Sequence, residues 1–517
     1  MSVSSHDLRS LALTTLFPGF VGTAEPPSWV GRLAADGLGG VVLYGRNIDP
    51  DLGDDGVAAL TSPLRAAGLL VAIDEEGGDV TRLDAAVGSA LPGNAALGAL
   101  DDHALTEEVA AELGGRLRRC GIDLNFAPVA DVDTNAENPV IGARSFGADP
   151  DLVARHVAAF VTGQQRHGVA ATAKHFPGHG GTSEDSHLTV PVLDEPIDVI
   201  RRTELPPFRA AIKADTKVVM TAHVRVPALD AGEMGTLSAP IVTGLLRDTL
   251  GFDGVVMTDG LDMRAISGTV GHAEAAVLAV RSGVDALCVG GDSTGPELVA
   301  AMADALVDAV RSGRLSEARL AEAAGRVRAL RAWSRGQFPG VSGDGSGGAS
   351  GLLAGTGAGD GIGPGVAATA RATRRAVRAA GDVRLAEPPL VLELHDPPSI
   401  AAGEVPWGIG TPLAARLPGT TIARLNADGP PVAEVLAAHP GRRVVISVRG
   451  IHRHPWQGGV VEQARLARPD LIVVEHDVGS PADVLGPHHV LAFGAARATA
   501  EAAADLLSPG WRPGDSA

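Results

Sequence analysis

Seven short apolar segments recur between residues 40 and 291, and each is followed by a longer segment with a helical pattern, such as TEEVAAELGGRLRRC (106–120). They are apolar throughout rather than alternating, as expected of strands in a parallel sheet that is buried on both faces. A repeated β-then-α order predicts an α/β fold with a (β/α)8 TIM-type barrel. The segments are GVVLYG (40–45), LLVAIDEEGG (69–78), DLNFAPVADV (123–132), GVAATAKHF (168–176), KVVMTAHV (217–224), GVVMTDG (254–260) and ALCVGG (286–291).

A second, smaller unit follows the barrel segments. The helical stretch 316–333 is followed by Gly/Ser-rich sequence typical of a flexible linker. We therefore predict a catalytic barrel at 1–337, a linker at 338–365 and an α/β sandwich-like domain at 366–517. Its expected elements are a helix at 366–380 and the strands LVLEL (390–394), RVVISV (443–448), LIVVEH (471–476) and VLAFG (490–494).

The composition narrows the class of partner. A net charge of −18 repels nucleic acid and anionic lipid, so we expect a small-molecule partner, with no nucleic acid and no membrane. No stretch of about 20 apolar residues is present, and the first residues lack the pattern of a signal peptide, which predicts a cytoplasmic location. The two cysteines, Cys120 and Cys288, are expected to be inert buried thiols.

Polar residues occur where the predicted strands end. The carboxyl ends of barrel strands form the active face of such enzymes, so a cluster there indicates a site. These residues are Asp74, Asp131, Lys174, His175, His223 and Asp259.

The loop KHFPGHGGTSEDSH (174–187) carries the densest group of such side chains. Asp185 and His187 are two residues apart, so on an extended chain they point the same way, and the carboxylate would fix the tautomer of the imidazole. That pair suits general acid/base catalysis near neutral pH. A zinc site made of His175, His179, Asp185 and His187 is the competing interpretation, but Phe-Pro-Gly between the first two prevents the helical spacing of a metal pair.

The segment GFDGVVMTDGLDM (251–263) delivers Asp259 to a strand end, where it is either a nucleophile or the N-cap of the next helix. Asp262 would lie in the first turn of that helix. Two further segments, 72–83 and 138–147, supply Asp74, Arg82 and Arg144 for sugar hydroxyls. A structural ion pair between Arg82 and Asp74 or Glu75 is the alternative. The turn with His452, His454 and Trp456 is either a surface turn or an interface or lid contact.

Taken together, the run KHFPGHG followed by DSH, the run DEEGG, the Arg-Ser-Phe segment and TDGLDM resemble the β-N-acetylglucosaminidase branch of glycoside hydrolase family 3, over residues 10–335. The resemblance implies that Asp259 is the nucleophile, His187 the acid/base and Asp185 its partner. It also implies that the terminal sugar is held by Asp74, Arg82, Arg144, Lys174 and His175, and we add His223 to this group. Glu75 stands where the family often has Gln, and we expect it to be tolerated.

The resemblance implies a retaining exo-β-N-acetylglucosaminidase that works in two steps, with no cofactor and no metal. A phosphorylase using the same site stays open, because a neutral imidazole repels phosphate less than a carboxylate does. A sugar-binding protein without turnover is a third possibility. The sequence does not separate chitobiose from muropeptides as substrate, and a homodimer is compatible with it.

Overall fold

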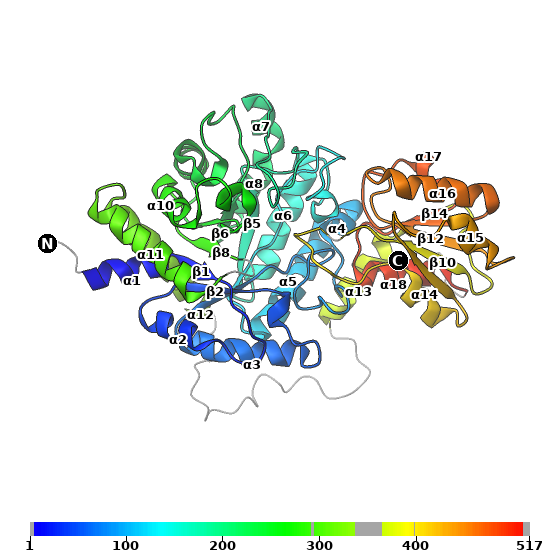
Figure 1. Cartoon of the computed structure of the whole chain (residues 1–517), viewed down its shortest axis with the longest axis horizontal. Helices are drawn as coiled ribbons and strands as arrows, with labels where there is room; N and C mark the ends of the chain where they lie inside the picture. Colours follow the sequence, from blue (N-terminus) through cyan, green and yellow to red (C-terminus); the bar gives the residue numbers. More distant parts are fainter. Residues whose placement is uncertain (1–4, 291–293, 337–363, 398, 510–517) are drawn as a thin grey trace.

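The computed structural model describes residues 5–290, 294–336, 364–397 and 399–509 (Figure 1). The predicted linker, 338–365, lies almost entirely outside the described residues. Two units lie side by side: the blue-to-green barrel and the yellow-to-red second unit. Within the part of the chain that is described, no helix combines the length and apolar character needed to cross a membrane.

The first unit is an eight-stranded parallel barrel, which confirms the predicted fold class. Strands β2 to β7 form one sheet in chain order, and β1 pairs with β8. Two isolated bridges, Gly19 to Val42 and Met257 to Ala286, join these sheets into a closed ring. The strands are β1 (Leu16–Pro18), β2 (Gly40–Leu43), β3 (Leu70–Ile73), β4 (Leu124–Asn125), β5 (Ala170–Phe176), β6 (Val218–Thr221), β7 (Val255–Thr258) and β8 (Leu287–Val289).

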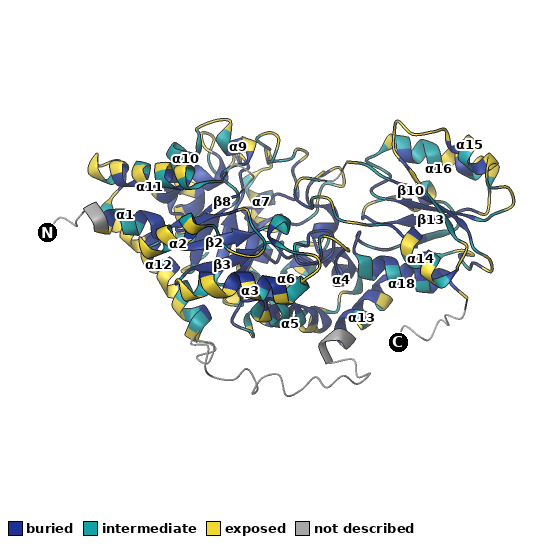
Figure 2. Ribbon diagram, turned by 60° about the horizontal axis from the view of Figure 1, so that its bottom comes forward, coloured by how far each residue is buried: buried dark blue, intermediate teal, exposed yellow. Residues whose placement is uncertain are grey.

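The strands are buried on both faces, which explains their unbroken apolar character. Along β2, Val42 belongs to a cluster that fills the barrel, whereas Val41 and Leu43 belong to the layer beneath the helices. Figure 2 shows the result: the strands are dark blue, and the exposed residues lie mainly on the outer faces of the helices.

Helices surround the barrel and carry ordinary end signals. Asp102 accepts from the backbone N–H of Leu105 at the start of α5, and that helix ends in three arginines that suit its dipole. The barrel's helices are α1 (Ser5–Thr14), α2 (Ser28–Ala35), α3 (Gly53–Ala66), α4 (Asn94–Leu100), α5 (His103–Arg119), α6 (Pro150–Gln165), α7 (Ile197–Thr203), α8 (Leu205–Lys213), the π-helix η4 (Pro240–Thr249), α9 (Arg264–Ser267), α10 (His272–Ser282), α11 (Pro296–Arg311) and α12 (Glu317–Gly336), with short 3₁₀ turns η1 (Gly45–Asn47), η2 (Gly142–Arg144) and η3 (Gly235–Leu237).

The second unit is a six-stranded sheet between helices, with the order β11-β10-β12-β13-β14-β9 and only β9 antiparallel among these strands. All four predicted strands are present, although the last covers 489–491 rather than 490–494, and the predicted helix 366–380 ends at Ala376 because a strand occupies 378–380. Its elements are α13 (Pro364–Ala376), β9 (Arg378–Ala380), β10 (Leu390–Leu394), α14 (Gly410–Arg416), β11 (Thr421–Leu425), α15 (Val432–Ala437), β12 (Val444–Val448), α16 (Pro455–Ala467), β13 (Ile472–Glu475), α17 (Ala482–Leu485), β14 (His489–Leu491) and α18 (Arg497–Leu507).

The second unit contacts the barrel through the loops that follow the barrel strands. Asp79, on the loop after β3, accepts from Arg449 and from the backbone N–H of Ala495, both at 2.6 Å. His452 bonds through Nε2 to the carbonyl of Ala136 at 2.9 Å, so this histidine is an interface contact. The second unit therefore lies against the edge of the predicted active face.

Candidate active site

The barrel brings the predicted strand-end residues to one place. Asp74 directly follows β3, His223 lies just after β6 and Asp259 directly follows β7, while Lys174 and His175 belong to the end of β5. Residues far apart in sequence thus meet at the carboxyl ends of neighbouring parallel strands.

An irregularity in β5 turns two of these side chains into the site. The register with β6 shifts between Ala173 and Phe176, and a cis peptide bond joins Lys174 to His175. A register shift of this kind re-aims side chains and is common next to active sites. The Lys174 side chain is buried, and its Nζ lies 2.6 Å from Asp74 Oδ1 and 2.6 Å from Glu76 Oε1.

Glu76 links two of the predicted sugar-binding cations. Arg144 donates to it through Nε at 3.0 Å and Nη2 at 2.7 Å, a fork that matches the carboxylate. Burial raises the pKa of Glu76, but Arg144 and Lys174 outweigh burial and hold it well below its ordinary value. Sequence reasoning did not single out Glu76. Its position two residues after Asp74, on the same side of an extended chain, was the available signal.

Arg82 makes the ion pair that the alternative interpretation expected, and it also bridges the two units. Its Nη2 donates to Asp74 Oδ2 at 3.1 Å, and the same guanidinium donates to the carbonyls of Ala401 and Ala402 at 2.8 and 3.1 Å. Glu75 contacts the Arg82 main chain instead, accepting from its N–H at 2.7 Å. Asp74 is thus held between two cations, Arg82 and Lys174.

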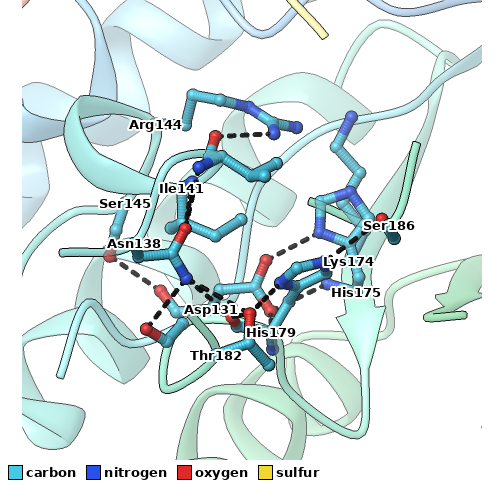
Figure 3. A network of polar contacts seen from close by, with 12 residues as sticks. Asp131, Asn138, Ile141, Arg144, Ser145, Lys174, His175, His179, Thr182 and Ser186 are labelled. Atoms are coloured by element: carbon cyan, nitrogen blue, oxygen red, sulfur yellow. Dashed lines mark hydrogen bonds and ion pairs between the residues drawn. The ribbon is translucent and has the colours of Figure 1, made fainter. Parts of the chain in front are cut away.

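Asp131 organises the start of the 174–187 loop, as Figure 3 shows. It accepts from His175 Nδ1 at 2.7 Å and from the backbone N–H groups of His175 and His179 at 3.2 and 2.8 Å. Burial raises the pKa of Asp131, but His175 outweighs it and the net shift is downward. His179 Nε2 in turn lies 3.2 Å from the hydroxyl of Ser186, the residue that stands between Asp185 and His187 in the sequence. The partnership of His179 and Ser186 was not predicted.

Asp259 is an ionised carboxylate in a buried position. Burial raises its pKa, but the imidazoles of His175, His223 and His187 outweigh burial and bring the value to about 2. The backbone N–H of Gly260 donates to its Oδ1 at 2.8 Å. Helix α9 begins only at Arg264, so Asp259 is not its N-cap.

Two details of this region differ from or extend the sequence-based expectation. Asp262 lies in the turn before α9 rather than in its first turn, because α9 begins only at Arg264. His223 bonds to Thr236 Oγ1 at 2.7 Å and to the Gly260 carbonyl at 3.0 Å, so both ring nitrogens contact the protein beside Asp259. Sugar binding by His223 stays a prediction.

Asp185 and His187 form the expected pair. His187 Nδ1 lies 2.7 Å from Asp185 Oδ1, and the backbone N–H of His187 donates to the same oxygen at 2.8 Å. Burial raises the pKa of Asp185, but its hydrogen bonds from His187 outweigh burial and lower it. The carboxylate assigns the proton of Nδ1, so Nε2 is the ring nitrogen available to a substrate.

The described residues hold no group of three or more His, Cys, Asp and Glu side chains arranged around a metal position. The histidines of the zinc interpretation have other partners: His175 contacts Asp131, and His179 contacts Thr182 and Ser186. A cleft of about 1120 Å³ opens beside the site, lined by Arg144 and Asp185 on the barrel and by residues of the second unit that include Trp407 and Arg424.

The family model described as the glycosyl hydrolase family 3 N-terminal domain matches residues 27–330, more than half of the chain. The chain belongs to glycosyl hydrolase family 3. The predicted family is therefore confirmed.

Several proteins similar to this chain carry names of the β-hexosaminidase group. The family 3 β-N-acetylglucosaminidase of Paenibacillus sp. str. FPU-7 is 34% identical, with a TM-score of 0.84 over 98% of this chain and 97% of its own. A β-N-acetylhexosaminidase of Beutenbergia cavernae is also 34% identical, with a TM-score of 0.57 over 64% of this chain and 99% of its own. Beta-hexosaminidase A of Pseudoalteromonas piscicida is 33% identical, and the match spans 63% of this chain and 57% of that protein. The predicted enzyme class, a family 3 glycoside hydrolase of the β-hexosaminidase group, is confirmed.

Proposed function

We propose that this family 3 chain is a retaining, exo-acting β-N-acetylglucosaminidase that uses an Asp–His acid/base dyad. The observation that carries the proposal is the pairing of two features. One is the ionised, buried carboxylate of Asp259. The other is the His187–Asp185 dyad, close enough for its imidazole to lower the pKa of Asp259. A nucleophile and a proton donor at one site are what retention of configuration requires.

The neighbouring polar groups fit a single terminal sugar. Lys174, Glu76 and Arg144 are buried, and with Asp74 they form an alternating row of charges whose remaining hydrogen-bonding capacity suits hydroxyl and amide groups. A buried row of this kind accepts the end of a chain more readily than its middle, which supports exo action.

In the first step, Asp259 attacks the anomeric carbon while the glycosidic bond breaks, and the leaving oxygen takes the Nε2 proton of His187. Asp185 stabilises the imidazolium that is present before this transfer. In the second step, neutral His187 takes a proton from water, and the resulting hydroxide attacks the anomeric carbon and releases Asp259. The dyad returns to its starting protonation state.

The test is hydrolysis of p-nitrophenyl β-N-acetylglucosaminide by the purified chain, with and without inorganic phosphate. We expect free N-acetylglucosamine at a rate that phosphate does not change. Sugar 1-phosphate at a raised rate would replace the hydrolase by a phosphorylase, and no product would favour a sugar-binding protein. The expected cytoplasmic location stays a prediction, to be checked by cell fractionation.

Variants assign the roles. Asp259→Ala abolishes turnover, and added azide restores it with formation of the α-glycosyl azide, because azide takes the place of the nucleophile. The matched control is Asp253→Asn, an exposed carboxylate just before the same strand, which leaves activity unchanged. Formation of the β-azide by Asp259→Ala would contradict the assignment of the nucleophile.

A further inference from the structure

We propose that the cleft between the two units is the leaving-group subsite, that the indole of Trp407 is its platform, and that it takes an uncharged pyranose. This inference rests on the proposed function and names the substrate class of the same site.

The cleft begins at the catalytic groups. Asp185 of the dyad and Arg144 line its barrel side. The loop that lines its other side, 399–407, is tied to the sugar-binding residues because Arg82 donates to the Ala401 and Ala402 carbonyls while it contacts Asp74. A group that leaves the anomeric carbon on the His187 side therefore passes into this space.

The cleft presents apolar side chains that face solvent. Leu188, adjacent to His187, is 55% exposed, and Ile400 on the opposite wall is 56% exposed. Trp407 is half-buried; the centre of its ring lies 4.7 Å from that of His395, with the two planes tilted by 37°, and its ring is edge-on to His476 at 5.5 Å. The two imidazoles hold the indole in place. A pyranose has an apolar face of C–H groups, which complements an indole face and two aliphatic side chains.

The charges in the cleft disfavour an anionic occupant. Each of its four arginines already has a carboxylate partner: Arg144 pairs with Glu76, Arg424 with Glu393, Arg449 with Asp79 and Arg453 with Asp477.

Three exposed carboxylates, those of Glu137, Glu184 and Glu404, also line the cleft, and none of them forms an ion pair with another described residue. The uncompensated charge is negative. It repels a carboxylate or a phosphate and leaves a neutral sugar unaffected.

The experiment compares kcat/KM for four substrates: methyl β-N-acetylglucosaminide, di-N-acetylchitobiose, the N-acetylglucosaminyl disaccharide whose leaving sugar carries a lactyl carboxylate, and the methyl ester of that carboxylate. The methyl glycoside has no leaving sugar that could pack against Trp407. We expect the wild type to prefer the ester to the free carboxylate by about 10-fold, and less at high salt.

Trp407→Ala lowers kcat/KM for chitobiose by about 10-fold, because loss of a stacking aromatic ring typically has an effect of that size. The same substitution leaves kcat/KM for the methyl glycoside unchanged, and Trp407→Phe retains most of the activity on chitobiose. If Trp407→Ala fails to fold, Leu188→Ala and Ile400→Ala test the same wall from exposed positions. Leu466→Ala, 83% exposed and outside the cleft, is the matched control.

Neutralising Glu137, Glu184 and Glu404 together to Gln raises kcat/KM for the carboxylate-bearing disaccharide alone. The inference is overturned if the wild type prefers the free carboxylate, or if Trp407→Ala slows the methyl glycoside and chitobiose equally. In both cases hydrolysis continues, so the proposed function stands. If the wild type releases N-acetylglucosamine from none of the four substrates, the proposed function fails first.

Discussion

Replacement of Asp185 by Asn tests the dyad with the smallest change of shape. One oxygen of Asp185 accepts from both Nδ1 and the backbone N–H of His187, at 2.7 and 2.8 Å. The backbone donor requires an acceptor at that position, so the amide oxygen of Asn, rather than its NH₂ group, occupies it. The ring therefore keeps its orientation, and the change removes a charge.

The size of the effect follows from that single contact. A hydrogen bond to a charged group contributes about 1.5–3 kcal/mol to stability. Because this bond stabilises the protonated imidazole that must donate in the first step, kcat/KM should fall by about 10- to 150-fold.

The assay compares kcat/KM for a p-nitrophenyl and a 2,4-dinitrophenyl glycoside. The dinitrophenolate leaves without a proton, so kcat/KM for that substrate should fall little in Asp185→Asn, whereas kcat/KM for a substrate that needs the proton should show the full loss.

Glu184→Gln is the matched control, because Glu184 is the exposed neighbour of Asp185 and accepts only from the Thr189 hydroxyl among the contacts that the structure shows. It should leave kcat/KM for both substrates unchanged. Equal losses of kcat/KM for the two leaving groups in Asp185→Asn would refute the role of the dyad.

Three further substitutions probe the surroundings of the site. Burial raises the pKa of Glu75 to about 7, so between about pH 4.5 and 7 the folded chain holds a proton that the unfolded chain has released, and the free energy of unfolding falls as pH rises through this range. Glu75→Gln should remove up to about 3 kcal/mol of that fall. An identical pH dependence of urea unfolding in the wild type and the variant would contradict this. Asp79→Asn leaves Arg449 without its ion-pair partner and should weaken the docking of the second unit by about 3 kcal/mol. In urea unfolding, the first transition should then occur at a lower urea concentration. An unchanged first transition would argue against this role of Asp79. Glu76→Gln leaves Lys174 and Arg144 short of one negative charge and should lower kcat/KM at least about 100-fold; full activity would show that the row does not hold the sugar.

The strands were predictable where burial on both faces left long apolar runs. The sequence did not reveal β1, because three residues ending in Pro18 carry too little pattern, nor β9 and β11, which lie at the sheet edges and are partly exposed. The predicted strand ends correctly located Asp74 and Asp259, but they did not show which side chains form pairs at those ends. The contact between Lys174 and Asp74 joins residues 100 positions apart, and it depends on the curvature of the closed barrel.

The carbonyls that hold Arg82 lie more than 300 residues further along the chain. No local pattern marks such a contact, because backbone carbonyls carry no sequence signal. Asp79 is part of the 72–83 segment, but its partner Arg449 lies 370 residues away, so no local pattern marks Asp79 as a residue that docks the second unit onto the barrel.

The pairing of β1 with β8 has a consequence for synthesis on the ribosome. Leu16 pairs with Leu287, so about 270 residues must be translated before the partner of the first strand exists, which takes roughly 15 to 55 seconds at bacterial elongation rates. Until then β1, whose Leu16 and Phe17 are fully buried in the finished barrel, has a strand neighbour only on its β2 side, through the bridge between Gly19 and Val42. The first strand of the barrel therefore lacks one of its two neighbours until the last strand has been made. A nascent chain that already contains β1 but not yet β8 should bind chaperones that recognise apolar segments.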